Sequence, residues 1–161
     1  MRNSTRPTRV IRWNVHCKDH GHRAVTYALA GDTYGRLLGG TPRHELAEFN
    51  SWEDPIFDEV DELVNELLLS RERGTSDCFG LVLGVACDPA PSGHLYDFTG
   101  KIWCPICGSP NLISYGPDDP PQFEVIDLPH VTHNTWRRFG DAEKRERIRE
   151  ALQEAGCLPR G

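Results

Sequence analysis

The sequence predicts a single α+β domain, in which an antiparallel sheet is joined by a helical insertion and a C-terminal helix. Apolar and polar residues alternate over 10–16 and again over 25–29, the period of half-buried strands. Residues 56–68 place apolar side chains at helical spacing, and residues 141–155 form a second amphipathic segment that ends at Gly156. A length of 161 residues is ordinary for one domain.

Composition shifts along the chain divide it into an arm and one domain that contains an insertion. Residues 1–8 are basic and lack periodicity, which predicts a flexible arm. Residues 9–161 are expected to form one domain, with residues 32–76 as a helical insertion. Within the insertion, Thr41 followed by Pro42 is typical of a helix start, which predicts a short helix to about residue 49.

The longer helix of the insertion is expected to begin after Ser51, a residue type that caps helix N-termini. Residues 78–87 are almost wholly apolar and predict a buried strand in the middle of the sheet. Further strands are expected at 94–103, 112–115 and 123–128.

The overall composition excludes several classes of protein. No apolar run is long enough for a transmembrane helix, and the first residues lack the apolar stretch of a secretory signal, so we expect a cytoplasmic protein. A net charge of −6 argues against a globally basic nucleic-acid binder. Six cysteines are too few for a disulfide-built mini-protein and are better explained as metal ligands or buried thiols.

The charge is unevenly distributed. Residues 1–23 carry six basic side chains against Asp19, a balance of +5, whereas residues 44–66 carry nine acids without Lys or Arg. One interpretation is a solvated tail and a solvated helix face. The alternative is an acidic surface on the helix at 53–70 that meets a basic partner.

The strongest local motif is Cys104-Pro-Ile-Cys107-Gly108. Two thiolates separated by two residues can grip one metal ion through a tight turn, and the glycine permits the positive φ that such a turn needs. A redox dithiol is the alternative, although such a motif usually opens a helix.

A second segment has the same form. Cys17-Lys-Asp-His20-Gly21 shares the pattern C-x-x-[C/H]-G, and each motif lies between two predicted strands. Two such turns facing each other would enclose one ion with four ligands. His22 is an alternative to His20, and Cys87 or His94 are alternative ligands. Cys78 and Cys87 are expected to be buried thiols, and Cys157 to be incidental.

The paired motifs resemble a zinc ribbon over residues 10–30 and 95–116, with a histidine at position 20 and a long insertion between the halves. The resemblance implies a structural Zn²⁺ held by Cys17, His20, Cys104 and Cys107.

The function expected from such a closed site is a zinc-binding adaptor or interaction module within a larger assembly, with a protein as partner. Nucleic-acid association is an alternative that the zinc-ribbon resemblance implies, through the basic arm and the basic residues of 137–149. A metal-dependent hydrolase built on His94, His130 and His133 is another. The last alternative function is that of an acidic inhibitor or immunity-type protein, which the acidic residues of 44–66 suggest.

Overall fold

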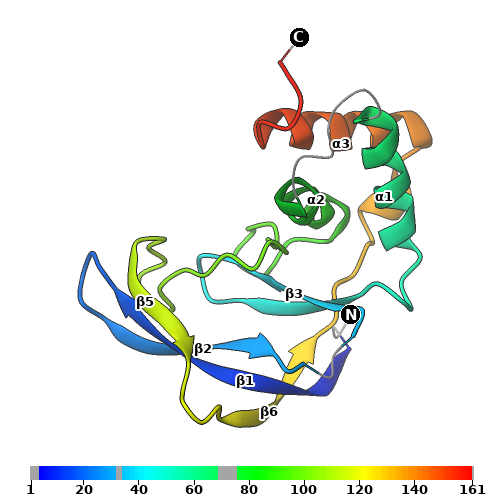
Figure 1. Cartoon of the computed structure of the whole chain (residues 1–161). Coiled ribbons are helices and arrows are strands. Elements are labelled where there is room, and N and C mark those ends of the chain that lie inside the picture. The colour runs from blue at the N-terminus through cyan, green and yellow to red at the C-terminus, as the bar shows by residue number, and fades with distance from the viewer. Residues whose placement is uncertain (1–3, 32–33, 69–75, 161) are drawn as a thin grey trace.

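The computed structural model describes residues 4–31, 34–68 and 76–160. Its largest sheet is organised around the 13-residue strand β1 (Thr5–Cys17). One edge of β1 pairs antiparallel with β2 (Arg23–Leu29), and the other edge pairs first with β6 (Phe123–Pro129) and then with β5 (Leu112–Pro117) (Figure 1). Strands β5 and β6 therefore act together as one interrupted neighbour of β1.

The covered side of β1 changes along the strand. Thr8 and Val10 are buried near its start, whereas Val15 and Cys17 are buried near its end. Alternate residues of a strand point to opposite faces, so the first pair lies on one face and the second pair on the other. The strand thus contacts one part of the molecule with its first half and a different part with its second half.

A second, two-stranded sheet lies between the first sheet and the helices. It consists of β3 (Arg36–Gly40) and β4 (Leu46–Asn50), paired antiparallel. The helices α1 (Ile56–Leu67), α2 (Ser76–Leu83) and α3 (Asp141–Glu154) gather on the side of this sheet that faces away from β1 (Figure 1). Two short 3₁₀ turns, Gly84–Ala86 and Trp136–Arg138, complete the helical layer.

The main apolar core fills the space between β4 and the helices. Its members are mostly aliphatic and aromatic side chains that are almost fully buried, and they include Phe49, Val60, Leu83, Trp136, Ile148 and Leu152. Three consecutive residues of β4, Ala47 to Phe49, are buried, so both faces of this strand are covered. Strand β4 is therefore the middle layer of an α+β fold, the class expected from the sequence.

The sequence prediction is wrong for two strands. Residues 78–87 do not form a central strand, because they belong to α2 and the 3₁₀ turn that follows it. Two glycines let this helical segment press against residues 96–99: a Cβ on Gly84 would lie 2.0 Å from the carbonyl oxygen of Tyr96, and one on Gly80 would lie 3.0 Å from Phe98. The expected strand at 94–103 is reduced to a single bridge between Asp97 and Gly40.

The expected helix after Pro42 is also wrong. Thr41 accepts hydrogen bonds from the backbone N–H groups of Arg43 and Glu45 in a turn, and β4 follows, so the insertion at 32–76 contains a hairpin as well as a helix. Helix α1 is capped by Asp54, whose carboxylate accepts from the N–H of Ile56 at 3.0 Å. The hydroxyl of Ser51, the expected cap, instead donates to the carbonyl of residue 35.

The ends of the chain differ from the sequence prediction in two respects. Residues 1–3 of the expected arm lie outside the described residues, but residues 5–8 are part of β1 and pair with β6. Cys157 is not incidental, because it forms a disulfide with Cys78, which also corrects the interpretation of Cys78 as a free thiol. Cys87 is a buried thiol as expected, and burial raises its pKa.

The expected strands at 112–115 and 123–128 are confirmed, and so is the C-terminal helix. Helix α3 ends shortly before Gly156, which adopts a φ of 76°. This left-handed conformation is the one that favours glycine after a helix.

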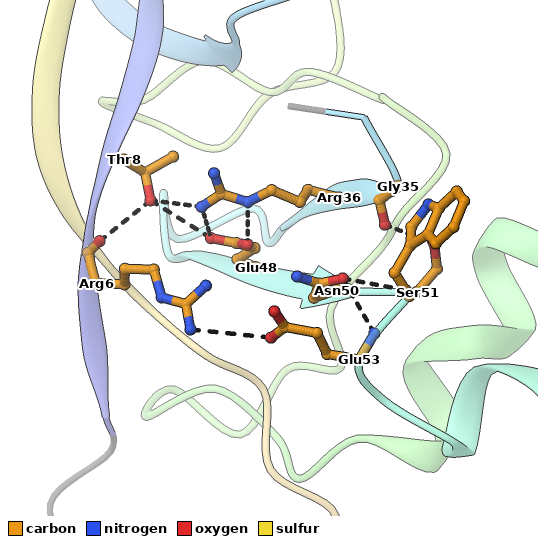
Figure 2. A network of polar contacts seen from close by, with 9 residues as sticks. Arg6, Thr8, Gly35, Arg36, Glu48, Asn50, Ser51 and Glu53 are labelled. Atoms are coloured by element: carbon orange, nitrogen blue, oxygen red, sulfur yellow. Dashed lines mark hydrogen bonds and ion pairs between the residues drawn. The ribbon is translucent and has the colours of Figure 1, made fainter. Parts of the chain in front are cut away.

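A buried ion pair connects β1 to the β3–β4 sheet. The guanidinium of Arg36 donates to both carboxylate oxygens of Glu48, which is fully buried, and donates to the hydroxyl of Thr8 at 2.9 Å (Figure 2). Burial raises the pKa of Glu48, but the hydrogen bonds from Arg36 and its positive charge lower this pKa by more than burial raises it. The pKa of Glu48 therefore lies below its usual value. The carboxylate is thus held ionised between two layers of the fold.

Replacing Glu48 by Gln should destabilise the fold by about 3 kcal/mol, because it removes the charge-assisted hydrogen bonds between Arg36 and a fully buried carboxylate. Glu53→Gln is the matched control, since Glu53 pairs with Arg6 at 3.9 Å on the surface (Figure 2) and should cost less than about 1 kcal/mol. Urea denaturation of both variants measures the difference. Equal destabilisation by the two substitutions would contradict this account of the buried pair.

The Cys78–Cys157 disulfide should stabilise the fold. It closes a separation of 79 residues, and its loss should cost about 4 kcal/mol through the greater entropy of the unfolded chain. Alkylation of the metal-free, denatured, non-reduced protein should modify four cysteines and, after reduction, all six. Six modified cysteines before reduction would show that Cys78 and Cys157 are not joined.

Candidate metal centre

Two turns of the same backbone geometry face each other at one end of the first sheet. We call residues 17–22 the first knuckle and residues 104–109 the second knuckle. In the first, the N–H of Cys17 donates to the carbonyl of His22, and in the second the N–H of Cys104 donates to that of Ser109, both at 2.8 Å. The glycine of each knuckle, at positions 21 and 108, has a φ of 66° and 74° respectively. The repeat seen in the sequence is therefore a structural repeat.

Strand pairing brings the two knuckles together. Cys17, the last residue of β1, is opposite Leu112 at the start of β5, and the N–H of Lys18 donates to the carbonyl of Asn111 at 2.9 Å. Segments about 90 positions apart in the chain therefore become neighbours through backbone hydrogen bonds.

Asp19 of the first knuckle binds the second knuckle and Asn111, two residues after it. Its carboxylate accepts from the hydroxyl of Ser109 at 2.5 Å and from the side-chain amide of Asn111 at 3.2 Å. These hydrogen bonds lower the pKa of Asp19. The arrangement fixes the distance between the knuckles, and it was not anticipated from the sequence. The available signal was polar residues at 19, 109 and 111, which by themselves indicate only a solvated turn.

The sulfur and nitrogen atoms of the knuckles converge on one point. The ligand atoms of Cys17, His20, His22 and Cys107 all lie within 4.8 Å of one another. Within this group the sulfurs of Cys17 and Cys107 are 3.6 Å apart. The sulfur of the fully buried Cys104 lies 3.7 Å from Nδ1 of His22. The cluster could hold a metal ion, and all four residues expected from the sequence are part of it or border it.

The environment of Cys104 favours the thiolate that binds metal ions. Burial raises the pKa of its thiol, but hydrogen bonds from the backbone N–H groups of Cys107 and Ile106, and from His22, outweigh this effect and lower the pKa to about 7. Such N–H···S contacts are the expected product of a tight turn that folds back over its first cysteine.

The second knuckle is also packed against the insertion. A Cβ on Gly108 would lie 2.6 Å from the carbonyl oxygen of Pro42. A side chain at this position would therefore collide with the backbone of the loop before β4, in addition to opposing the positive φ. The knuckle is held in place on this side by the turn that was expected to start a helix.

The other candidate ligands lie elsewhere. Cys87 donates a hydrogen bond to the carbonyl of Leu83 in the helical core, and His94 contacts Ser92 on the surface. His133 is buried with both ring nitrogens engaged, one by the carbonyl of Ala86 at 2.6 Å and the other by Asp54 at 2.5 Å. Within the described parts of the chain, three or more metal-binding side chains converge at the knuckles and at no other place, so the hydrolase set is not assembled.

Many of the acidic side chains of residues 44–66 form ion pairs or hydrogen bonds with other parts of the molecule. Glu48 binds Arg36, Asp54 binds His133, and the carboxylate of Glu45 accepts from Ser92. On helix α1, Glu59 pairs with Lys144 at 2.5 Å, and Glu66 pairs with Arg145, both on α3. The acidic segment thus attaches α1 to α3.

The basic residues are paired in a similar way. Arg12 lies 3.7 Å from Glu124, and Arg147 and Arg149 bind acids one turn away on α3. The guanidinium of Arg9 lies over the ring of Phe123, 4.0 Å from its centroid. These contacts reduce the charge that the expected basic surface would present to phosphates.

No family model, curated protein or solved structure matches this chain. Among the described residues, no helix is long and apolar enough to cross a membrane.

Asp19→Ala should weaken metal binding about tenfold, because the knuckles would lose the hydrogen bonds that hold their ligands at the correct separation. Asp118→Ala is the matched control: Asp118 accepts a comparable hydrogen bond from Asn14 on the same sheet but away from the cluster. Competition with a chromogenic chelator measures both affinities. A loss of the same size in the two variants would contradict a specific role for Asp19.

Proposed function

We propose that the chain is a zinc-stabilised protein-interaction module. One structural Zn²⁺ would be held by Cys17, Cys104, Cys107 and one histidine. The observation that carries the proposal is the convergence of thiol and imidazole ligands from two backbone-equivalent knuckles.

The distances support a tetrahedral zinc site. With Zn–S bonds of about 2.3 Å and a Zn–N bond of about 2.0–2.1 Å, tetrahedral geometry separates two sulfurs by about 3.8 Å and a sulfur from a nitrogen by about 3.6 Å. The pair Cys17–Cys107 is separated by 3.6 Å and the pair Cys104–His22 by 3.7 Å. These two separations match opposite edges of one tetrahedron.

The same distances favour His22 over His20 as the fourth ligand. His20 occupies the position equivalent to Cys107, which is why the sequence favours it, but it is exposed and its ring is stacked on that of His22, with centroids 5.3 Å apart. His22 is more buried, and its Nδ1 is directed at the sulfur of Cys104. In this proposal His20 shields the site and is not a ligand.

Four protein ligands leave no open coordination position for a substrate, so the zinc would be structural. Structural zinc binding contributes about 10 kcal/mol or more in small zinc domains, which is comparable to the whole stability of a typical domain, about 5–15 kcal/mol. In this chain the ion would join the end of β1 to the segment that leads into β5. Loss of the ion should therefore disorganise this end of the sheet first.

An exposed apolar stripe supports the interaction role. Tyr115, Phe123 and Val125 lie opposite Val15, Ile11 and Arg9 of β1, all odd positions that share one face, and Ile113 lies two residues before Tyr115, at the register shift of β5. The four apolar residues of β5 and β6 are between 46 and 69% exposed. A row of this kind on one sheet face is typical of protein contact surfaces.

Elemental analysis should find one zinc per chain in the wild type and in His20→Ala, and much less in His22→Ala. Because both histidines lie in the first knuckle, the two variants are matched controls for each other. The cobalt-substituted protein should show strong thiolate-to-metal absorption in the first two cases. Full zinc content in both variants would exclude a site that depends on His22, and loss only in His20→Ala would restore His20 as the ligand.

The interaction role has a separate test. A photo-crosslinking amino acid at Val125, 69% exposed, should give one discrete adduct with another protein in cells. The same group at Leu95, 48% exposed and remote from the stripe in sequence, is the control and should give none. Equal labelling from both positions, or no adduct from Val125, would contradict a partner at the stripe while leaving the zinc site untouched.

A further inference from the structure

A cavity of about 280 Å³ lies between the first sheet and the β3–β4 hairpin. Its walls come from β1 and β2 on one side, from β3 and the loop before β4 on a second side, and from residues 97–103 on a third. Its volume is close to the lower end of the range typical of ligand pockets, about 300–1,000 Å³. The space therefore suits a small molecule of one or two rings.

The lining is mainly apolar and contains two indole rings. Trp13 enters from β1, and Trp103 enters from the residue before the second knuckle, with Leu38, Leu46 and Ile102 among the aliphatic walls. Trp13 is supported from outside by Tyr115, whose ring stacks on it with centroids 5.8 Å apart. Aromatic walls of this kind bind planar rings by stacking and edge contacts.

The charged groups of the cavity are not equivalent. Arg36 is committed to Glu48 and Thr8, and the carboxylate of Asp97 accepts from the N–H and hydroxyl of Thr99 at 2.7 and 2.6 Å. The ammonium of Lys101 lies 5.4 Å from the centroid of Trp103, and the described residues pair it with no carboxylate. Among the described residues, the ammonium of Lys101 therefore has no carboxylate partner and lies beside the indole ring of Trp103.

His44 adds a polar group that the backbone holds in an unusual conformation. Its φ of 56° makes it the single non-glycine residue with positive φ among the described residues. Its Nε2 lies 3.2 Å from the hydroxyl of Thr26, which is buried on β2. Left-handed conformations of residues other than glycine are costly and occur often at ligand sites.

We propose that this cavity binds an aromatic carboxylate of one or two rings. The rings would lie between Trp13 and Trp103, the carboxylate would face Lys101, and the His44–Thr26 pair would bound the inner wall. The cavity lining includes no proposed zinc ligand and no residue of the exposed stripe, although Tyr115 of the stripe stacks on Trp13. The cavity therefore adds a ligand to the proposed interaction module.

The probe for this proposal is 2-naphthoate, with the uncharged 2-naphthylmethanol as its matched analogue. In two-dimensional NMR spectra of the zinc-loaded chain, naphthoate should shift the indole N–H signals of Trp13 and Trp103. The signals of Trp52, which is 71% exposed, and of the buried Trp136 should stay in place and serve as internal controls. Shifts of Trp52 alone, or no shift at Trp13 and Trp103 at millimolar probe, would overturn the proposal.

Two variants separate the charge from the cavity. Lys101→Met should weaken naphthoate binding about fivefold, the effect of losing one exposed ion pair, and should leave the binding of naphthylmethanol unchanged. Ala28→Phe, which fills the cavity from β2, should abolish the binding of both probes. Lys101 is exposed, so its variant gives a result even if Ala28→Phe does not fold. Undiminished naphthoate binding in Lys101→Met would rule out the carboxylate contact.

Discussion

The structure depends on keeping two knuckles, 87 positions apart at their first cysteines, in contact at one end of a sheet. Strand pairing between β1 and β5 and the hydrogen bonds of Asp19 bring them together, and these contacts lie on an exposed turn where each is worth little by itself. A metal ion at the point where the thiols and imidazoles converge would make this contact strong. The proposed zinc would therefore stabilise the contact between the two knuckles, which hydrogen bonds alone hold weakly.

The first half of β1 is attached to its neighbours by a hydrogen-bonded ion pair and not by a proposed metal ion. There the strand is attached to the β3–β4 sheet through Thr8, which contacts the Arg36–Glu48 pair. The covered face of β1 changes between these two halves, so one strand serves two packing surfaces. The cavity is lined by Trp13, which lies between these two halves of the strand.

The sequence predicts what local pattern determines. Strands with clear alternation, helix α1 with its apolar spacing and helix α3 with its terminal glycine are all present. The apolar run at 78–87 predicts a strand but forms a helix, because periodicity alone does not distinguish a buried strand from a buried helix. Its two glycines, which allow the helix to approach residues 96–98, acquire a meaning only when that partner is known. The Cys78–Cys157 disulfide likewise depends on tertiary contacts.

The sequence points to the place where a metal ion could bind, because the knuckle pattern is local and repeated, and Cys17, His20 and Cys107 of the predicted set lie in the cluster. The sequence does not decide between His20 and His22. His20 is favoured by its position in the repeated pattern, whereas His22 is favoured by the direction of its side chain, which only the structure shows. X-ray absorption at the zinc edge of the purified protein tests the central claim most directly. We expect three sulfurs at about 2.3 Å and one nitrogen at about 2.0–2.1 Å. Coordination mainly by oxygen, or the absence of stoichiometric zinc, would contradict it.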